Sequence, residues 1–148
     1  MRSFLLSIGL LLAFTVSVSA ADIAGIWQSQ TNADGYIHVE IAPCEDKVCG
    51  VIAKAFDVNG EPAEFKYLGK TMIWDMIPAA NGEFTGGRIF APDREKTYGG
   101  MLKLHGDVLI VRGCALGGLV CKEQKWNRVI QETEGTDNNN TGTIQAGQ

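Results

Sequence analysis

The sequence predicts an all-β protein, and three observations support this prediction. From residue 22 to about residue 131 the apolar residues fall in short runs separated by Gly, Pro, Asn and Asp, a pattern typical of short strands joined by turns. Apolar and polar residues alternate, most clearly from Tyr36 to Ile41, as in an antiparallel strand with one wet face. The spacing that indicates long helices is missing from the sequence. We therefore expect an eight-stranded antiparallel up-and-down barrel, whose closure hides the sheet edges; two packed sheets are the alternative.

Length, composition and charge narrow the class of protein. The chain has 148 residues, of which 45% are apolar and 20% charged, with 18 Gly and 4 Cys. This composition indicates one globular domain and excludes a disordered or collagen-like chain. The formal net charge is −4, from 13 Lys and Arg against 17 Asp and Glu, and the basic residues form no run. We expect no nucleic-acid partner, because neutralising phosphates needs clustered positive charge.

Residues 1–20 have the features of a signal peptide. Arg2 gives a positive start, residues 4–18 form an apolar run, and Ser19 and Ala20 are small residues suited to cleavage. This run is shorter than the roughly 20 residues of a transmembrane helix, which is the alternative interpretation. We expect cleavage after Ala20, no membrane span in the mature chain, and export to the periplasm, with the extracellular medium as the other destination.

The first four expected strands are residues 23–29, 35–42, 48–56 and 70–76. Each is an apolar or alternating run bounded by turn residues. In the fourth, Met72, Trp74 and Met76 alternate with three other residues and therefore share one face. Parity carried through residues 44–56 places Lys54 inside the barrel, and whether a β-bulge resets the facing stays open.

The last four expected strands are residues 84–91, 97–105, 107–114 and 119–130. Two of them contain glycine pairs, at 86–87 and 99–100, which indicate a bulge, a bend or close backbone approach and lack the ending of a phosphate loop. Residues 57–66 form the longest connection, with a helical turn expected near residues 63–65. Because residues 132–148 are almost free of apolar side chains, we expect residues 21–131 to form the barrel domain and 132–148 a disordered tail.

The four cysteines are expected to form two disulfides. Export places them in an oxidising compartment, where an even number indicates disulfides, although four cysteines allow three pairings. Cys44 and Cys49 flank one polar turn, and Cys114 and Cys121 flank another. Residues facing each other in an antiparallel hairpin lie within disulfide range, so we expect Cys44–Cys49 and Cys114–Cys121. A zinc site made of all four thiolates is the alternative, at odds with the spacing and the compartment.

Groups suited to catalysis are few. His38 and His105 belong to no catalytic motif, and strand alternation and a turn signal predict a solvated strand residue and a hairpin-end residue. Cleavage after Ala20 leaves Ser29 as the one serine, and oxidised cysteines cannot act as nucleophiles. We expect no catalytic residue, no metal and no cofactor. The alternative is an unrecognised hydrolase using converging carboxylates such as Asp75, Asp93 and Glu95.

Several blocks of the sequence resemble a known family. Gly25-Ile26-Trp27 in the first strand and Trp126-Asn127-Arg128 in the last are similar to the signature of lipocalin and calycin barrels. More closely, the body resembles the bacterial exported family known as domain of unknown function 2147. Phe84 replaces a Trp frequent in that family, and Ala91-Pro92-Asp93 replaces its Asp-Pro. The matching blocks are Gly25-Ile26-Trp27, Ile41-Ala42-Pro43-Cys44, Cys49-Gly50, Leu68-Gly69, Gly86-Gly87-Arg88-Ile89-Phe90, Lys96-Thr97-Tyr98, Leu109-Ile110-Val111-Arg112-Gly113-Cys114 and Trp126-Asn127-Arg128.

The resemblance implies a lipocalin-like barrel in which Trp27 closes one end and Arg128 packs over it. A guanidinium can stack on indole while its donors satisfy exposed carbonyls. Since an eight-stranded barrel can hold one small ligand, we expect the protein to bind a small apolar or amphipathic molecule, with Met72, Trp74 and Met76 as lining residues. The alternative is a filled barrel that acts as a structural or protein-binding module of the cell envelope.

Overall fold

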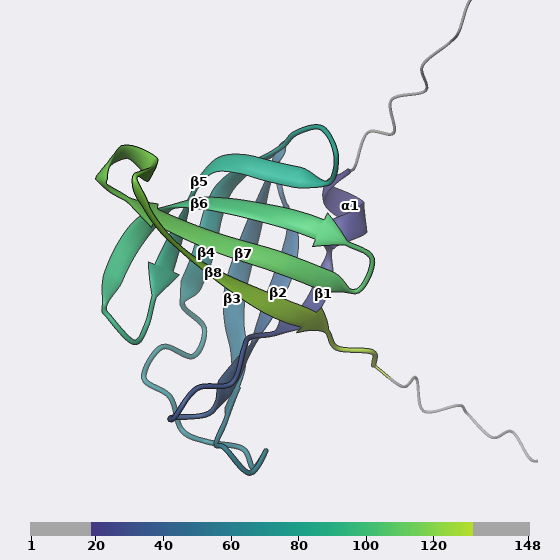
Figure 1. Cartoon of the computed structure of the whole chain (residues 1–148). Helices are drawn as coiled ribbons and strands as arrows, with labels where there is room; N and C mark the ends of the chain where they lie inside the picture. The colour runs from purple at the N-terminus through teal and green to yellow at the C-terminus, as the bar shows by residue number, and fades with distance from the viewer. Residues whose placement is uncertain (1–18, 132–148) are drawn as a thin grey trace, which may run out of the picture.

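The structure is a computed structural model that describes residues 19–131, and it is a closed antiparallel barrel (Figure 1). Each strand pairs with the next along the chain, and the last pairs with the first. A single helical turn, α1 (Ala20–Ile23), precedes the barrel, and a short 3₁₀ turn, η1 (Leu116–Gly118), joins the last two strands. The strands are β1 (Gly25–Gln28), β2 (Tyr36–Cys44), β3 (Lys47–Phe56), β4 (Thr71–Pro78), β5 (Glu83–Ala91), β6 (Lys96–His105), β7 (Val108–Ala115) and β8 (Val120–Arg128).

The eight expected strands are all present, so the predicted barrel is confirmed and the packed-sheet alternative is wrong. The first strand begins later than expected because Ile23 ends α1 instead of opening β1. The Ser19 hydroxyl accepts a hydrogen bond from the amide of Ala21, and the Asp22 carboxylate accepts one from the amide of Ser19. This reciprocal cap holds the turn, and it buries Ile23 against the barrel end.

A β-bulge in β3 resolves the facing that the sequence left open. His38 pairs with Lys54, but the next residue of β2, Val39, pairs with Ile52, so Ala53 has no opposite residue. The extra residue resets the alternation. Ile52 is therefore buried inside the barrel while Lys54 is exposed.

Irregular pairing in β4 overturns the expectation that Met72, Trp74 and Met76 share one face. Ile73 and Met76 both point inward and are fully buried, whereas Trp74 is only partly buried. Between them Asp75 adopts a φ of 57°, which breaks the two-residue period. The register with β3 shifts twice along this stretch. The alternation visible in the sequence is therefore interrupted by one residue with left-handed backbone.

The connection between β3 and β4 differs from the expected one. No helical turn forms at residues 63–65; instead, turns occupy residues 66–69. The loop begins with Asp57, whose carboxylate accepts hydrogen bonds from the amides of Glu61 and Asn59. These bonds lower the pKa of Asp57 because they favour the charged form. The expected tail, residues 132–148, lies outside the described residues, as do residues 1–18 of the expected signal peptide.

The packed interior lies toward the end of the barrel that α1 covers. Within residues 19–131 no helix is long and apolar enough to cross a membrane. The largest fully buried side chains come from α1 and all eight strands, which means that this half of the barrel is filled by the protein itself. They are Ile23, Trp27, Val39, Ile41, Val48, Ile52, Ile73, Met76, Phe84, Leu102, Leu109 and Trp126.

Closure of the barrel is incomplete along one seam. β8 pairs with β7 from Val120 to Asn127, but it pairs with β1 only through Arg128 and Asn127. β1 ends at Gln28, and the chain then leaves β8 to form the hairpin end at Asn32 and Gly35. Residues 120–126 of β8 consequently have no second strand partner among the described residues. The expectation that closure hides every edge is wrong for this stretch.

Candidate binding cavity

One end of the barrel is sealed by Trp27 and Arg128, as the resemblance implies. The guanidinium carbon of Arg128 lies 4.3 Å from the centre of the Trp27 ring. Its Nη1 and Nη2 donate to the carbonyls of Ala24 and Asp22, each at 2.9 Å, and its Nε donates to Asp107 Oδ1 at 3.0 Å. The indole nitrogen of Trp27 donates to the carbonyl of Ile23 at 2.9 Å. The first and last strands and α1 are thus joined by one cluster.

Gly25 is required by the same cluster. Its φ is +136°, a conformation that side chains rarely adopt, and a Cβ added there would lie 3.1 Å from Nη1 of Arg128. The glycine two residues before the tryptophan therefore makes room for the arginine that covers it.

The opposite end opens into a cavity of about 1910 Å³. Its walls are apolar side chains from six strands, and its rim consists of the turns between β1 and β2, β3 and β4, β5 and β6, and β7 and β8. Polar and charged groups therefore surround an apolar interior. The apolar wall residues are Ile37, Ala55, Met72, Ile89, Val111 and Trp126.

Three glycines in neighbouring strands shape the base of this cavity. Gly87 pairs with Gly100, and Gly100 pairs with Gly113. A Cβ on Gly100 would lie 2.3 Å from the methyl carbon of Met76, and one on Gly87 would lie 2.7 Å from its sulfur. The Met76 side chain fills the space that these glycines leave. A Cβ on Gly87 would also lie 2.4 Å from the carbonyl oxygen of Trp74, so the expected close backbone approach is confirmed there, whereas Gly100 is approached by side chains. Gly113 faces the ring of Tyr98 instead.

The three residues expected to line a cavity are placed differently from one another. Met72 lies on the cavity wall. Met76 is fully buried in the packed interior, and Trp74 pairs with the exposed Arg88 and is not part of the wall. The tryptophan on the wall is Trp126, whose indole nitrogen donates to Gln124 Oε1 at 2.9 Å. Sequence alternation could not identify it, because its same-face neighbours on β8 include Lys and Gln.

At the rim, the β3–β4 loop is fastened to the β5–β6 turn. Lys66 and the Tyr67 hydroxyl both donate to the carboxylate of Glu95. The hydrogen bond from Lys66 is the main cause of the lowered pKa of Glu95, and the same bond raises the pKa of Lys66. The Tyr67 ring packs edge-on against Phe65 and Phe90, with centroids 5.4 and 5.1 Å apart. One side of the cavity mouth is therefore held by a polar and aromatic contact.

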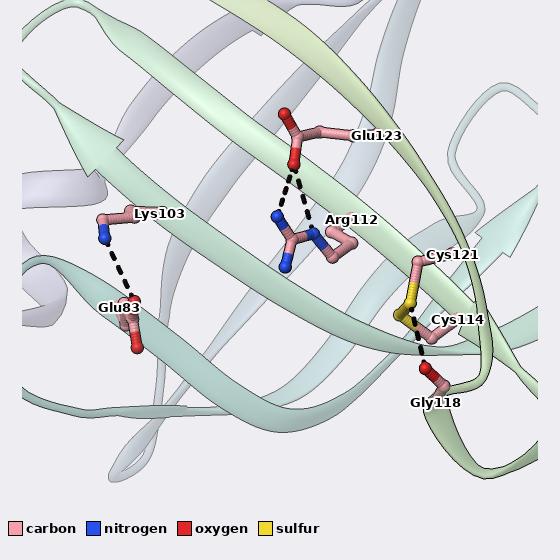
Figure 2. A network of polar contacts seen from close by, with 7 residues as sticks. All are labelled: Glu83, Lys103, Arg112, Cys114, Gly118, Cys121 and Glu123. Carbon is pink, nitrogen blue, oxygen red and sulfur yellow. Dashed lines mark hydrogen bonds and ion pairs between the residues drawn. A yellow bond between two sulfur atoms is a disulfide. The ribbon is translucent and has the colours of Figure 1, made fainter.

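Both expected disulfides are present, and no cysteine among the described residues is free. Cys44–Cys49 closes the β2–β3 hairpin, and Cys114–Cys121 closes the β7–β8 hairpin at the cavity end. Figure 2 shows the second disulfide with Gly118 beside it, and farther along the same two strands the ion pair of Arg112 and Glu123. These pairings overturn the alternative of a four-thiolate zinc site.

His38 is only partly exposed, so the solvated strand residue that alternation predicts is found in part. Its ring packs 4.6 Å from the centroid of Phe56 and 5.8 Å from that of Tyr36, and its Nε2 is buried without a hydrogen-bond partner. Burial lowers the pKa of His38, and the nearby positive charge of Lys54 lowers it further. His105 is exposed at the end of β6, as expected for a hairpin-end residue.

The carboxylates considered for catalysis do not form one site. Asp75 pairs with Lys47, Asp93 with Arg94, and Glu95 with Lys66. Within residues 19–131, no three His, Cys, Asp or Glu side chains lie close enough together to hold a metal ion.

The comparisons with known proteins agree with this fold. The model of a family described as "Uncharacterized protein conserved in bacteria (DUF2147)" matches residues 25–128. Among solved structures, the chain is similar to protein HP1028 from Helicobacter pylori, which is described as belonging to the lipocalin family. The TM-score is 0.60 at 20% sequence identity, over 74% of this chain and 84% of that one. No curated protein matches the chain.

Proposed function

The chain belongs to the DUF2147 family of uncharacterized bacterial proteins, and we propose that it binds a small apolar or amphipathic molecule in the open end of its barrel. The observation that carries the proposal is the division of the barrel into a packed half and an open half. In the open half, apolar wall residues from six strands are surrounded by polar and charged turns, a combination typical of small-molecule pockets.

The chemistry of the cavity supports the class of ligand. Ile37, Met72, Ile89 and Val111 offer aliphatic and thioether surfaces, which pack well against irregular apolar molecules. Lys122, which also borders the cavity, has no carboxylate within ion-pair distance among the described residues. A ligand with a polar or anionic end therefore fits as well as a wholly apolar one. The lipocalin-like fold agrees with a role in binding, and we assign no catalytic step.

We place this activity outside the cytoplasm. The expected signal peptide and the two disulfides both favour export, because disulfides persist in oxidising compartments. The periplasm is the proposed location. A structural or protein-binding role is the second candidate, favoured by the exposed side chains of Leu116, Leu119 and Val120 beside the cavity mouth.

Two measurements test the ligand proposal. Native mass spectrometry of the protein purified from its own bacterium should show a retained mass that leaves on mild denaturation. In parallel, titration of the stripped protein with 1-anilinonaphthalene-8-sulfonate, an amphipathic dye, should saturate at one site and quench Trp126. A Trp74→Phe variant removes the outer tryptophan and should keep the signal.

A matched pair of variants locates the site. Gly113→Leu places an aliphatic side chain in the cavity, where a Cβ meets Tyr98 at 3.5 Å without collision, and should weaken dye binding at least about tenfold. Ala42→Leu adds an aliphatic side chain at an exposed position of β2 away from the cavity and should bind like the original protein. Equal dye affinity of Gly113→Leu and the original protein would refute the site. Absence of both a retained mass and saturable binding would favour the second candidate.

A further inference from the structure

The unpaired edge of β8 is a surface that neither the cavity nor the seal uses. We propose that two copies of the chain associate through residues 122–126 of β8, in antiparallel register centred on Gln124. Figure 1 shows β8 crossing the front of the barrel beside β7, with the chain that follows β1 turning away from it.

The edge is long enough to accept another strand. Residues 120–126 have β7 on one side and no strand on the other within the described part of the chain. The backbone amides and carbonyls that face that side are a template for a further strand. The side chains of Lys122, Glu123 and Lys125 are exposed, so no other described segment covers them.

The charges on the edge select a second copy as the occupant. A two-fold axis normal to the sheet places one residue of β8 opposite its own counterpart. Centring on Gln124 sets Glu123 opposite Lys125 of the other copy, twice. Centring on Lys122, Glu123 or Lys125 instead sets that residue against a like charge. Opposite charges facing each other stabilise a strand pair and like charges destabilise it.

The groups in this register are available. Lys125 has no carboxylate within ion-pair distance among the described residues, and the Glu123 carboxylate, which accepts from Arg112 at 2.7 Å, has a second oxygen free. Lysines on an edge strand often prevent pairing. Here the alternation of sign disfavours the registers centred on Lys122, Glu123 or Lys125, whereas the register centred on Gln124 forms two ion pairs.

The ends of the paired strands strengthen the choice. In this register the pairing ends where β1 of the other copy begins to pair with Asn127 and Arg128, and Leu119 and Val120 of each copy face that end of β1 and the chain after β8, where Ile130 follows. These three side chains are 86%, 58% and 77% exposed, values that are high for aliphatic residues of a folded domain. The second copy would also cover the seam beside Trp126 and Gln124, which border the cavity.

Sedimentation velocity from about 1 to about 100 µM protein tests the proposal, because dimer formation depends on concentration. The original protein should dimerise. Lys125→Glu sets two Glu–Glu pairs across the axis, and Glu123→Lys sets two Lys–Lys pairs, so each should dimerise at least about tenfold more weakly. An equal mixture restores both ion pairs and should give a one-to-one heterodimer by native mass spectrometry. Lys54→Glu, the same change at an exposed site on β3, should dimerise like the original protein.

Three results would overturn the proposal. The first is a full-length protein that stays monomeric at about 100 µM. This holds also if the protein dimerises once residues 132–148 are removed, since that segment would then be the occupant of the β8 edge. The second is a Lys125→Glu variant that dimerises as well as the original protein. The third is a pair of monomeric variants whose mixture also stays monomeric, which would exclude the register.

Discussion

Replacing Arg128 by Met tests whether one side chain holds the closed end of the barrel. The guanidinium covers the Trp27 ring and donates to two backbone carbonyls, and the arginine side chain is only 23% exposed. Two charge-assisted hydrogen bonds contribute about 1.5 kcal/mol each at the low end of their range, which suits a partly exposed group. The stacked cation adds about 0.5–1 kcal/mol. We expect the free energy of unfolding to fall by about 3.5–4 kcal/mol.

Arg112→Met is the matched control. Arg112 also pairs with a carboxylate on a neighbouring strand, but its side chain is 41% exposed and it covers no ring. Its loss should cost at most about 1 kcal/mol. Arg128→Lys keeps the charge but cannot reach both carbonyls and Asp107 together, so it should recover less than half of the loss.

Urea unfolding followed by circular dichroism and tryptophan fluorescence measures these differences. If Arg128→Met and Arg112→Met are equally stable within about 0.5 kcal/mol, Arg128 does not hold the barrel end, and the geometry around Trp27 has no energetic consequence.

Three further predictions concern the interior, the partly buried imidazole of His38 and a hairpin. Gly100→Ala should destabilise the protein by about 1–3 kcal/mol, because the added methyl group collides with Met76. In a double-mutant cycle, the double variant Gly100→Ala, Met76→Ala should lose less stability than the two single variants lose in sum. The pKa of His38 is lowered in the folded state, so the unfolded state binds a proton more tightly. The free energy of unfolding should therefore fall as the pH drops below 6.5. The variant His38→Phe should flatten the pH dependence of urea midpoints between about pH 7 and pH 5. Peptide mapping without reduction should recover Cys114 linked to Cys121, and the double alanine variant should lose about 2 kcal/mol; a peptide linking either cysteine to the other hairpin would contradict the structure.

Strand positions followed from sequence because each run is short and bounded by turn residues. The cysteine pairing could be predicted equally well from the sequence, since each pair flanks a hairpin turn and depends only on local geometry. The facing of side chains was harder. Ala53 and Asp75 look like ordinary strand residues, yet each interrupts the alternation, and such bulges depend on the neighbouring strand. The expected role of Trp74 failed for this reason.

The cavity could not be predicted from sequence patterns. Its wall combines single residues from six strands with a row of glycines, and no contiguous motif marks it. Trp126 was visible only as part of a family signature, with nothing to show which way it points. Ser19 and Asp22 form a helix cap that the sequence does contain, but the apolar residues around Ile23 favoured a strand.

The contacts of Arg128 also bear on the order in which the protein can fold during synthesis. The hydrogen bonds from this residue to Ala24 and Asp22 span 104 and 106 positions of the chain. Seven strands are therefore synthesised before Arg128, the residue that holds β1 in place. Hairpins can form locally as they emerge, but the ring cannot close, and contacts of such long range form slowly. Until then β1 of the nascent chain has an unpaired edge and Trp27 is uncovered. Chaperone binding and misassembly belong to this interval.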